Sequence, residues 1–519
     1  MSGIVDSSCF QRLRRIIQTS YSPLYSSAVH NRFVHSLGVF HLGKIASSQI
    51  VDEIKNKCSI DEESVSRLKD VFLIACLLHD VGHAPFSHTG EEFYLDDDKN
   101  YTSIHEQLIN EVQSDGFAKD VPDEKTSSAA PHEIMSAIVG LKTFPELFFS
   151  ADEREFFARC IIGYRYSDGE NNNRIKNCFI ELLNSKVIDV DKLDYLIRDA
   201  YITGFDTVNI DYMRLLKALT VIENGDNYEL AYYKDAISVI ENVIYAHDAE
   251  RKWIQGHPIV LYETYILQHI ISHICCEVSL LGKKLFCFDA LSDDGIKIKE
   301  NVNVRLMSDD DIIYLIKNVF PNKLGEEYFA RVRRRHPVWK SEAEYKAVFL
   351  AKTSGGEILD RFADTMSMIA KYLVGSSDTW SINDQMLDKL KEELVKIESK
   401  DELDNKTKEV QIRNKKKIIE LLEILKKYAI DEGVEFDFII IKATQFNSGF
   451  GKPDFSNINI CFPQRNGKDK FSKVGKIVSS LQAKEKDGDD YFYLFYKRAK
   501  EGVELDRFEL CDILIREFV

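Results

Sequence analysis

The segment LLHDVGHAPFSHTG, residues 77–90, holds three histidines and one aspartate within ten positions. It overlaps the end of the apolar run VFLIACLL, which predicts a buried helix that ends near His79. A neutral imidazole from His79 and a carboxylate from Asp80 would then meet at the edge of a core. Such a pair suits a divalent transition metal, and the carboxylate also suits Mg²⁺ or Mn²⁺. Two adjacent ligands do not complete a metal site, so others must come from distant parts of the chain.

Further candidate ligands lie on both sides of this segment. Upstream, HNRFVHSLGVF supplies His30 and His35 at the start of an amphipathic helical pattern. Downstream, VIDVDKLDYLIRDA supplies several aspartates, and on a helix Asp191, Tyr195 and Asp199 would share one face. A phenol between two carboxylates, with apolar neighbours, is an unusual face for packing alone.

An ordinary structural role remains open for each of these residues. A single histidine near a helix end is usually a core or capping residue, and a His-Asp pair alone is nearly uninformative. The order of a histidine, then a His-Asp pair at the end of a buried helix, then a carboxylate on another helix favours a metal centre.

The wider sequence predicts the elements that position these residues. The chain has 519 residues, of which 44% are hydrophobic, enough for two or three domains with sizeable cores. Eight of the 13 histidines fall within the first 132 residues, which indicates that the reactive site lies in this part of the chain. Residues 1–265 are expected to form one mostly helical unit, with apolar residues at helical spacing in 31–57, 65–80, 104–114, 131–141, 153–163, 175–200 and 236–254.

The rest of the chain divides into two further regions. Residues 266–430 continue the helical pattern as an extension, in which the charged segment 385–428 predicts two surface helices that could serve assembly. Residues 431–519 contain FDFIIIKAT, NINICFP and DYFYLFYKR, which are rich in β-branched and aromatic residues. These three stretches predict strands in a small α/β region.

Composition limits the classes of function. A net charge of −16 argues against extended nucleic-acid binding. No window approaches about 18 uninterrupted apolar residues, so no membrane span is expected. The amino-terminal residues lack the apolar run of a secretory signal, and ten scattered cysteines without a C-x-x-C pair favour a reducing compartment. A cytoplasmic protein is therefore expected.

Three motifs in this order, HNRFVHSLGV, LLHDVGHAPFSH and IDVDKLDYLIRD, resemble those of the HD-domain superfamily. More narrowly, they resemble the deoxynucleoside triphosphate (dNTP) triphosphohydrolases, which include bacterial dGTPase-like enzymes. The resemblance implies a mainly α fold, an HD-domain helical bundle to which the helical extension and the small C-terminal α/β region are added. It also implies a divalent metal ion, Mg²⁺, Mn²⁺, Fe²⁺ or Zn²⁺, held by the residues that match the family's four ligands: His35, His79, Asp80 and Asp191.

The same resemblance implies roles for residues around the metal. His83 and His88 match histidines that surround the phosphates, with a catalytic role for His83, and Arg32 matches an arginine that contacts phosphate. His105, in IHEQLI, matches the family's catalytic acid/base histidine. His132, in PHEIM, is a rival for that role, and the spacing from His88 favours His105. The residues that match contacts with phosphate, sugar, the 3′-hydroxyl or the base are Gln18, Lys192, Tyr195 and Asp199.

Elementary chemistry is consistent with these roles. A triphosphate carries about four negative charges, which the metal, Arg32, Lys192 and protonated histidines would neutralise. Histidines with a pKa near neutrality can protonate the leaving oxygen. Tyr195 could block the 2′ position of the sugar and so give a preference for deoxyribose.

Two segments depart from the family pattern or extend it. In IENVIYAHDAERKWIQGHPIV the family's later phosphate-binding helix is not matched without ambiguity, and Arg251 and His257 are candidates for phosphate contact. In FQRLRRI, Gln11 and Arg14 match an allosteric nucleotide site that the vertebrate member of the family forms at a subunit interface. A solvated basic face is an equal alternative for that segment. The SAM domain of the vertebrate member is not expected here, because the motifs begin near residue 10.

The resemblance implies a reaction in which water attacks the α-phosphorus of a dNTP and leaves a deoxynucleoside and tripolyphosphate. The setting would be control of dNTP pools or antiviral defence against phage. The implied partners are the dNTP substrate, a nucleotide activator and further copies of the chain in a dimer, tetramer or hexamer, without a membrane. Two alternatives stay open: an HD-type phosphodiesterase or nucleotidase acting on monophosphates or cyclic nucleotides, and a nucleotide-sensing regulatory protein with little turnover.

Overall fold

The computed structural model describes residues 1–57, 61–95, 102–121, 128–167, 170–206, 208–224, 227–330, 332, 334–350, 357–374, 380–399, 405–444, 448–464, 469–481, 490–497 and 506–518. The chain folds into two compact units, each drawn from separated stretches of sequence. Unit 1 contains residues 1–252, 277–320 and 447–486, and unit 2 contains residues 253–276, 321–446 and 487–519. Both units combine parts of the regions 1–265, 266–430 and 431–519, whose division into domains stays a prediction.

Unit 1 is mainly helical. Its helices are α1 (Ser2–Val5), α2 (Ser8–Arg12), α3 (Arg32–Lys57), α4 (Glu62–Leu78), α5 (Ile104–Val112), α6 (Asp115–Asp120), α7 (Pro131–Thr143), α8 (Ala151–Ile162), α9 (Asn171–Leu183), α10 (Val190–Thr203), α11 (Tyr212–Lys217), α12 (Ile237–Glu250), α14 (Phe288–Leu291), α15 (Asp309–Tyr314) and α21 (Pro453–Ser456).

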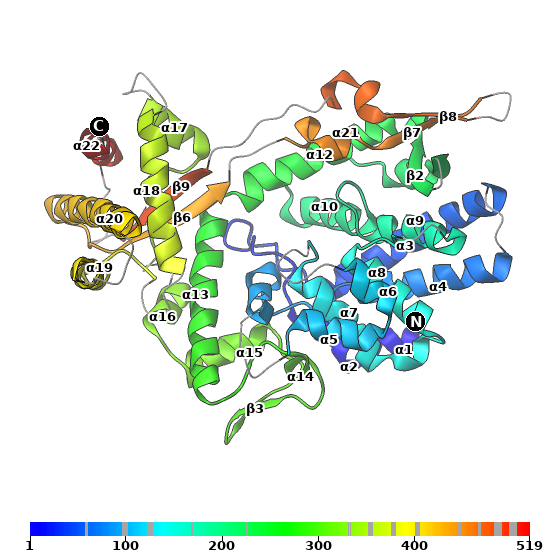
Figure 1. Cartoon of the computed structure of the whole chain (residues 1–519), viewed down its shortest axis with the longest axis horizontal. Coiled ribbons are helices and arrows are strands. Elements are labelled where there is room, and N and C mark those ends of the chain that lie inside the picture. Colours follow the sequence, from blue (N-terminus) through cyan, green and yellow to red (C-terminus); the bar gives the residue numbers. More distant parts are fainter. Residues whose placement is uncertain are drawn as a thin grey trace. The chain divides into compact units, whose positions relative to one another are not determined.

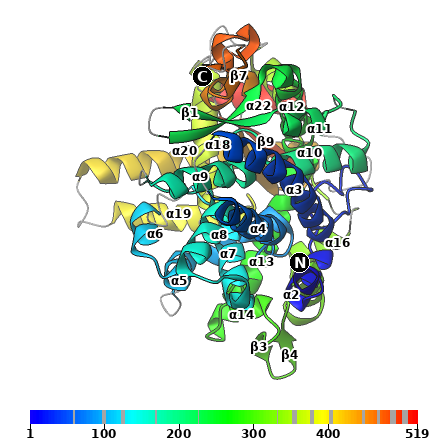
Figure 2. The ribbon, with the colours of Figure 1, turned by 90° about the vertical axis from the view of Figure 1, so that its right-hand side faces the viewer.

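The longer helices of unit 1 bring the motif-bearing segments together (Figures 1 and 2). α3 packs against α4, α9 and α10, while α7 packs against α5 and α8. In α4 every residue from Val71 to Leu78 is buried, and Asp61 caps the amino end by accepting the backbone N–H of Ser64. Burial of each large apolar side chain contributes about 1.5–3 kcal/mol. This run therefore holds α4 in the core up to Leu78 and places His79, the next residue, at the edge of the core.

A four-stranded sheet joins distant segments of unit 1. Its strand order is β1 (Leu219–Asn224), β2 (Asn227–Tyr233), β7 (Asn459–Phe462) and β8 (Lys470–Lys473). The outer pairs are antiparallel, whereas β2 and β7 run parallel, with Tyr232 opposite Ile460. α3 contacts β1 and α9 contacts β2, so the sheet supports helices of the bundle. A separate hairpin is formed by β3 (Ile296–Lys299) and β4 (Val302–Val304).

Unit 2 combines helices with a three-stranded antiparallel sheet. Its strand order is β5 (His336–Pro337), β9 (Asp490–Tyr496) and β6 (Phe438–Thr444). α18 packs against β6 and β9, and α19 pairs with α20. The helices of this unit are most of α13 (Pro258–Leu280), α16 (Lys323–Phe329), α17 (Glu342–Leu350), α18 (Glu357–Val374), α19 (Asp384–Glu398), α20 (Asn405–Glu432) and α22 (Arg507–Phe518).

The predicted fold class, a mainly α chain with small sheets towards its end, is confirmed. The strands predicted in the last region are β6, β7 and β9, and the helices predicted in the charged segment are α19 and α20. The helix predicted over 175–200 is two helices, because Asp189 accepts the backbone N–H of Lys192 and caps a new one, α10. β1 and β2 lie within the stretch predicted as mostly helical.

One helix bears on the expectation that no segment spans a membrane. By length and composition, α13 is apolar enough to do so, and 44% of its most apolar window is buried inside the protein. The core helix of a soluble protein has the same properties, so α13 alone is weak evidence for a span.

Candidate metal centre and histidine cluster

Four side chains from three places in the fold meet just beyond the carboxyl end of α4. α3 supplies His35, the residues after α4 supply His79 and Asp80, and α10 supplies Asp191. The Nε2 atoms of His35 and His79 lie 3.3 Å apart, and the Asp191 Oδ1 atom lies 2.9 Å and 3.7 Å from them. Asp80 oxygens lie 3.6 Å and 3.5 Å from the same two nitrogens. Ligands bound about 2.0–2.2 Å from one metal lie about 3.0–3.5 Å from one another, so these residues fit a single ion.

In His35 and His79, the ring nitrogen that faces away from the centre, Nδ1, is hydrogen-bonded to a neighbouring group. His35 Nδ1 is hydrogen-bonded to Asp194 Oδ2 at 2.7 Å, and His79 Nδ1 to the carbonyl oxygen of Cys76 at 3.0 Å. Arg198 donates to both oxygens of Asp194, at 2.9 Å and 2.8 Å. Partners of this kind fix the tautomer and the direction of a metal-binding imidazole. Both histidines therefore present Nε2 to the centre.

Charge at the centre favours a cation. Burial alone would lower the pKa of His35, but hydrogen bonds with two aspartates raise it to about 10. Burial would raise the pKa of Asp80, but the Arg32 guanidinium and two neighbouring histidines hold it well below its ordinary value. Against the effect of burial, hydrogen bonds with both histidines likewise lower the pKa of Asp191. The carboxylates around His35 therefore favour positive charge at this point, which a divalent transition metal would supply when it displaces the proton from the Nε2 atom of His35.

The histidine loop, residues 79–90, reverses direction through a strained turn. Phe86 and Ser87 both adopt the left-handed region, with φ of 58° and 55°, at about 1–3 kcal/mol each. Gly82 allows the loop to lie directly on α7, because a Cβ there would lie 2.3 Å from the backbone nitrogen of Ser136. The sequence between the histidines is thus constrained by backbone geometry as well as by chemistry.

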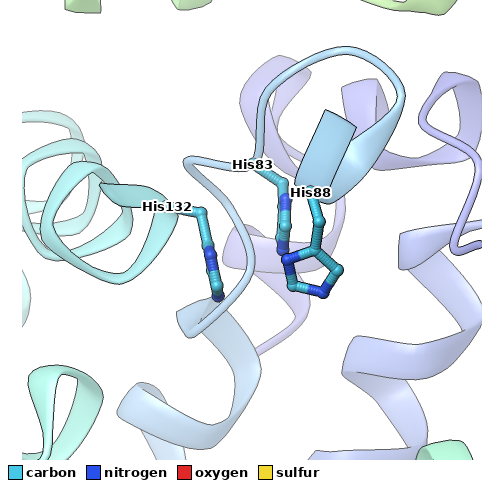
Figure 3. A group of neighbouring side chains, drawn as sticks. All are labelled: His83, His88 and His132. Carbon is cyan, nitrogen blue, oxygen red and sulfur yellow. The ribbon is translucent and has the colours of Figure 1, made fainter. Parts of the chain in front are cut away.

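A second group of imidazoles, the histidine cluster, consists of His83, His88 and His132 (Figure 3). The rings of His83 and His132 stack with centroids 4.0 Å apart, and the His88 ring lies 5.2 Å from each. Glu91 bridges two members, with Oε1 3.1 Å from His88 Nδ1 and Oε2 in contact with His132 Nδ1. The cluster adjoins the metal centre, because His83 Nε2 lies 3.4 Å from Asp80 Oδ1.

The members of the cluster differ in their affinity for a proton. Burial lowers the pKa of His83, and Arg32 and His132 lower it further. Burial also acts to lower the pKa of His132, but the hydrogen bond with Glu91 outweighs it, so the pKa is raised. The two histidines that it contacts hold the pKa of Glu91 well below its ordinary value, against burial. A neutral imidazole therefore stacks on one that retains its proton, an arrangement suited to acid–base chemistry.

Arg32 connects the metal centre with the histidine cluster. The buried guanidinium donates to Asp80 Oδ2 at 2.8 Å and to Ser87 Oγ at 2.9 Å. Its Nη2 atom lies 3.4 Å from His88 Nε2. A fixed guanidinium between a metal centre and imidazoles creates a site for the oxygens of an anion such as a polyphosphate.

Two of the residues predicted to hold phosphate or sugar are engaged with neighbours. Lys192 Nζ donates to Asp189 Oδ2 at 2.6 Å and to the carbonyl oxygen of Ser185 at 2.7 Å. Asp199 is buried, and its Oδ1 atom lies 2.7 Å from His30 Nε2. A substrate would have to share or replace these partners.

Gln18 and Tyr195 are differently placed. The Gln18 side chain is buried, and its Oε1 atom has no hydrogen-bond partner in the described part of the chain, so it can accept from a ligand. Tyr195 is half-buried on α10, and burial together with the nearby Glu250 carboxylate raises the pKa of its phenol.

The two rival histidines are placed differently. Among the described residues, the group with His83 and His88 contains His132 and not His105. His105 is buried on α5, and its Nε2 atom has no partner among the described residues. Spacing along the chain favoured His105, but spacing does not determine which helix returns to the histidine loop, and the ring of His132, on α7, is the one that stacks on His83. A catalytic role for His105 stays a prediction, and the geometry favours His132.

The candidates for an allosteric site lie together near the amino-terminal end. Gln11 Oε1 accepts a hydrogen bond from Arg14 Nε at 2.8 Å, and the Arg14 guanidinium lies 3.5 Å from the centroid of the Phe33 ring. These contacts hold the two side chains on one surface. Their role in nucleotide binding stays a prediction.

The two later phosphate candidates belong to different units. Arg251, in unit 1, begins a π-helical turn after α12, and together with burial it lowers the pKa of Lys452. The Nδ1 atom of His257, in unit 2, accepts a hydrogen bond from the backbone nitrogen of Ile259 at 3.2 Å. Phosphate contact by either residue stays a prediction.

Two residues shape the site in roles that the sequence did not assign: Asp194 was one of the downstream aspartates offered as candidate ligands, and Glu91 was given no role. Asp194 follows the ligand Asp191 by three residues, and Glu91 follows His88 by three. An acidic residue one helical turn beyond a candidate ligand or phosphate-side histidine is the signal that could have found both, because residues three apart share a face. That signal is weak alone, since such pairs are common on helix surfaces.

Gly38 allows α3 and α10 to approach closely enough for this geometry. A Cβ there would lie 1.8 Å from Asp194 Oδ1 and 2.4 Å from Arg198 Nη2. We expect Gly38→Ala to push Asp194 away from His35 and to weaken metal binding by about 10–100-fold. Metal content after dialysis at graded metal concentrations measures this, with Gly116→Ala as the control, because its nearest contact would be at 3.6 Å. Unchanged affinity would contradict the role of Asp194.

Comparison with known proteins agrees with this geometry. Residues 32–145 match the model of the HD domain family. An uncharacterised protein of Mycoplasma genitalium is 30% identical over 251 residues, which is 47% of this chain and 49% of that protein. The deoxynucleoside triphosphate triphosphohydrolase SAMHD1 of Homo sapiens is 30% identical over 325 residues, 59% of this chain and 48% of that protein. The chain spans about half the length of the curated relatives it matches.

Solved structures show a likeness in fold. The crystal structure of a phosphohydrolase from Bacteroides thetaiotaomicron matches with a TM-score of 0.51 and 18% identity, covering 96% of this chain and 95% of that chain. The family match over residues 32–145 includes His35, His79 and Asp80. The chain therefore carries an HD domain, and its resemblance to the HD-domain dNTP triphosphohydrolases is confirmed by relatives of that kind.

Proposed function

We propose that this protein is a metal-dependent hydrolase that converts a dNTP to a deoxynucleoside and tripolyphosphate. The observation that carries the proposal is the position of Arg32 and the histidine cluster directly beside the four candidate metal ligands. A polyphosphate needs several positive or hydrogen-donating groups over a length greater than one phosphate. The metal centre, Arg32 and the histidine cluster adjoin one another and together offer such groups to more than one phosphate.

The metal ligands are His35, His79, Asp80 and Asp191. When bound, a divalent cation would polarise phosphoryl oxygens and favour the ionisation of a water molecule. Two imidazoles and two carboxylates favour a transition metal such as Mn²⁺, Fe²⁺ or Zn²⁺ over Mg²⁺, which prefers oxygen ligands.

The chain's own residues would bind and orient the triphosphate and move protons. Arg32 and His88 would contact phosphate oxygens, and the neutral His83 would accept a hydrogen bond or a proton. In the reaction the oxygen of water joins the α-phosphorus, the bond from the α-phosphorus to the 5′-oxygen breaks, and that oxygen takes up a proton. His132 would donate this proton, because the hydrogen bond with Glu91 outweighs burial and raises its pKa, so that it holds its proton to a higher pH than an ordinary imidazole.

The residues of α10 and the segment before α3 would bind the nucleoside. Asp199 would accept a hydrogen bond from the 3′-hydroxyl, and Tyr195 would lie against the 2′ position. The buried Oε1 atom of Gln18, which has no partner among the residues that the structure describes, would accept a hydrogen bond from the sugar or base. Lys192 would release the Asp189 carboxylate and bind a phosphate oxygen in its place.

Several wider features belong to the same proposal. Relatives with 26–31% identity are named as deoxynucleoside triphosphate triphosphohydrolases. By analogy, we propose that the protein works in the cytoplasm as a homo-oligomer, is activated by a nucleotide, and controls dNTP pools or acts in antiviral defence. None of these features is needed for the chemistry of the site itself.

A product assay tests the function. Purified protein is incubated with Mn²⁺ or Mg²⁺ and each dNTP, alone and in mixtures, and the products are separated by anion exchange. Deoxynucleoside with tripolyphosphate is expected, and activity only in mixtures would indicate activation by a nucleotide. Hydrolysis of monophosphates or cyclic nucleotides instead would establish an HD-type phosphodiesterase or nucleotidase. Binding of nucleotides without turnover would establish a sensor.

A further inference from the structure

Two side chains from outside the site, Arg12 and Asp309, hold the histidine loop by hydrogen bonds to its backbone. Arg12, on α2, is buried, and its Nη2 atom donates to the carbonyl oxygens of Val81 at 2.7 Å and His83 at 2.9 Å. Its Nη1 atom donates to the carbonyl oxygen of Met307 at 2.7 Å. One guanidinium thus ties the first half of the loop to the chain that leads into α15.

Asp309, the first residue of α15, holds the second half of the loop. Its Oδ1 atom accepts the backbone N–H of Phe86 at 2.6 Å, and its Oδ2 atom accepts that of Ile17 at 2.8 Å. The carbonyl oxygen of Ile17 in turn accepts a hydrogen bond from the Ser87 hydroxyl. Both residues in the left-handed region are therefore fixed, directly or through Ile17, by one carboxylate that is more than 200 positions away in the sequence.

These contacts lie where the backbone is least stable by itself. Two consecutive residues other than glycine in the left-handed region persist only where surrounding structure holds them. Without the turn, His83 and His88 would not face one another across 5.2 Å. In the described part of the chain, neither Arg12 nor Asp309 forms a hydrogen bond or ion pair with the side chains of the metal ligands or with the histidine rings, so both act through the loop backbone.

We propose that Asp309 and Arg12 are positioning residues that hold the strained turn of the histidine loop and so align His83 and His88 for the reaction. This proposal deepens the proposed function, on which its kinetic readout rests. Its structural readout, the exchange of backbone amides in the loop, does not depend on any reaction. A failure of the proposed function and a failure of this inference can therefore be told apart.

The test compares Asp309→Asn with Asp310→Asn. An asparagine keeps the size of Asp309 but offers one acceptor oxygen, so either Phe86 or Ile17 loses its partner. Asp310 is the matched control, because its side chain is 75% exposed and its ion-pair partner is Arg15, at 3.8 Å. We expect Asp309→Asn to speed hydrogen exchange in peptides covering 84–90 and 15–19 and to lower kcat about tenfold. Asp310→Asn should match the unchanged protein in both.

A second substitution separates positioning from general destabilisation. Glycine adopts the left-handed region without steric cost, so Phe86→Gly added to Asp309→Asn should restore part of the lost kcat. Wild-type loop exchange and kcat in Asp309→Asn would overturn the proposal. So would faster exchange throughout unit 1 with no rescue by glycine, because that pattern indicates general destabilisation. If the unchanged protein hydrolyses no dNTP, the proposed function fails while the exchange comparison still decides this inference.

Discussion

Replacing Asp80 by asparagine is expected to remove the bound metal and to lower dNTP turnover by at least about a thousandfold, or about 4 kcal/mol of transition-state stabilisation. Asp80 is buried, and its oxygens lie close to both histidine ligands as well as to Arg32. An amide of the same size supplies no negative charge to the centre. The Arg32 guanidinium would then lie buried without its carboxylate, which further opposes a cation nearby.

The measurement of this variant needs three readouts. Metal content by atomic emission and product formation from each dNTP should both fall, whereas helix content by circular dichroism should not change. The control is Asp310→Asn, because the Asp310 side chain is 75% exposed and Arg15, its ion-pair partner at 3.8 Å, is 71% exposed. Full metal content or full activity in the Asp80 variant would end the proposal of a metal centre at this position.

Local rules predict where two of the four candidate ligands lie, whereas the full set of four was implied by the resemblance of the three motifs to the HD-domain superfamily. A run of eight buried apolar residues must end where a charged pair begins, so the sequence alone places His79 and Asp80 at the edge of a core. The helical period likewise predicts that Asp191, Tyr195 and Asp199 share a face of α10. Only the contact of α3 with both α4 and α10, which brings His35 to the same point, required the fold.

Other parts could not be predicted because they depend on pairing between distant segments. The parallel pairing of β2 with β7, some 230 positions apart in the sequence, places residues near 460 in the same unit as the HD-domain match at residues 32–145. Asp309 reaches the histidine loop in the same way. No local pattern of apolar or charged residues predicts such contacts, because the sequence of a strand or loop does not specify which distant segment it will contact.

The choice between His105 and His132 shows the same limit at the scale of one residue. Both precede a glutamate near the start of a helix, and both helices follow the histidine loop. What separates them is tertiary contact, because His132 stacks on His83 and meets Glu91. The consequence for catalysis is measurable.

We expect His132→Ala to lower kcat by about 10²–10⁴-fold, the range for loss of a general acid, and His105→Ala to change kcat by less than about tenfold. Metal bound by His35, His79, Asp80 and Asp191 should stay unchanged in both variants, because neither histidine is one of these four ligands. His105→Ala serves as the comparison variant, because it removes a buried histidine from α5, which contacts α8 as α7 does. A larger loss of kcat in His105→Ala than in His132→Ala would return the acid/base role to His105.

The dependence of rate on pH tests how Glu91 acts. The pKa of His132 is raised by its hydrogen bond with Glu91, against the effect of burial, so the protonated acid persists to a higher pH than an ordinary imidazole would allow. The rate should therefore fall as pH rises through this raised pKa. Glu91→Gln removes the negative charge, so the fall should move to lower pH while the maximal rate at acidic pH is largely kept. If the descending limb in Glu91→Gln stays where it is in the unchanged protein, His132 is not the group whose proton the reaction uses.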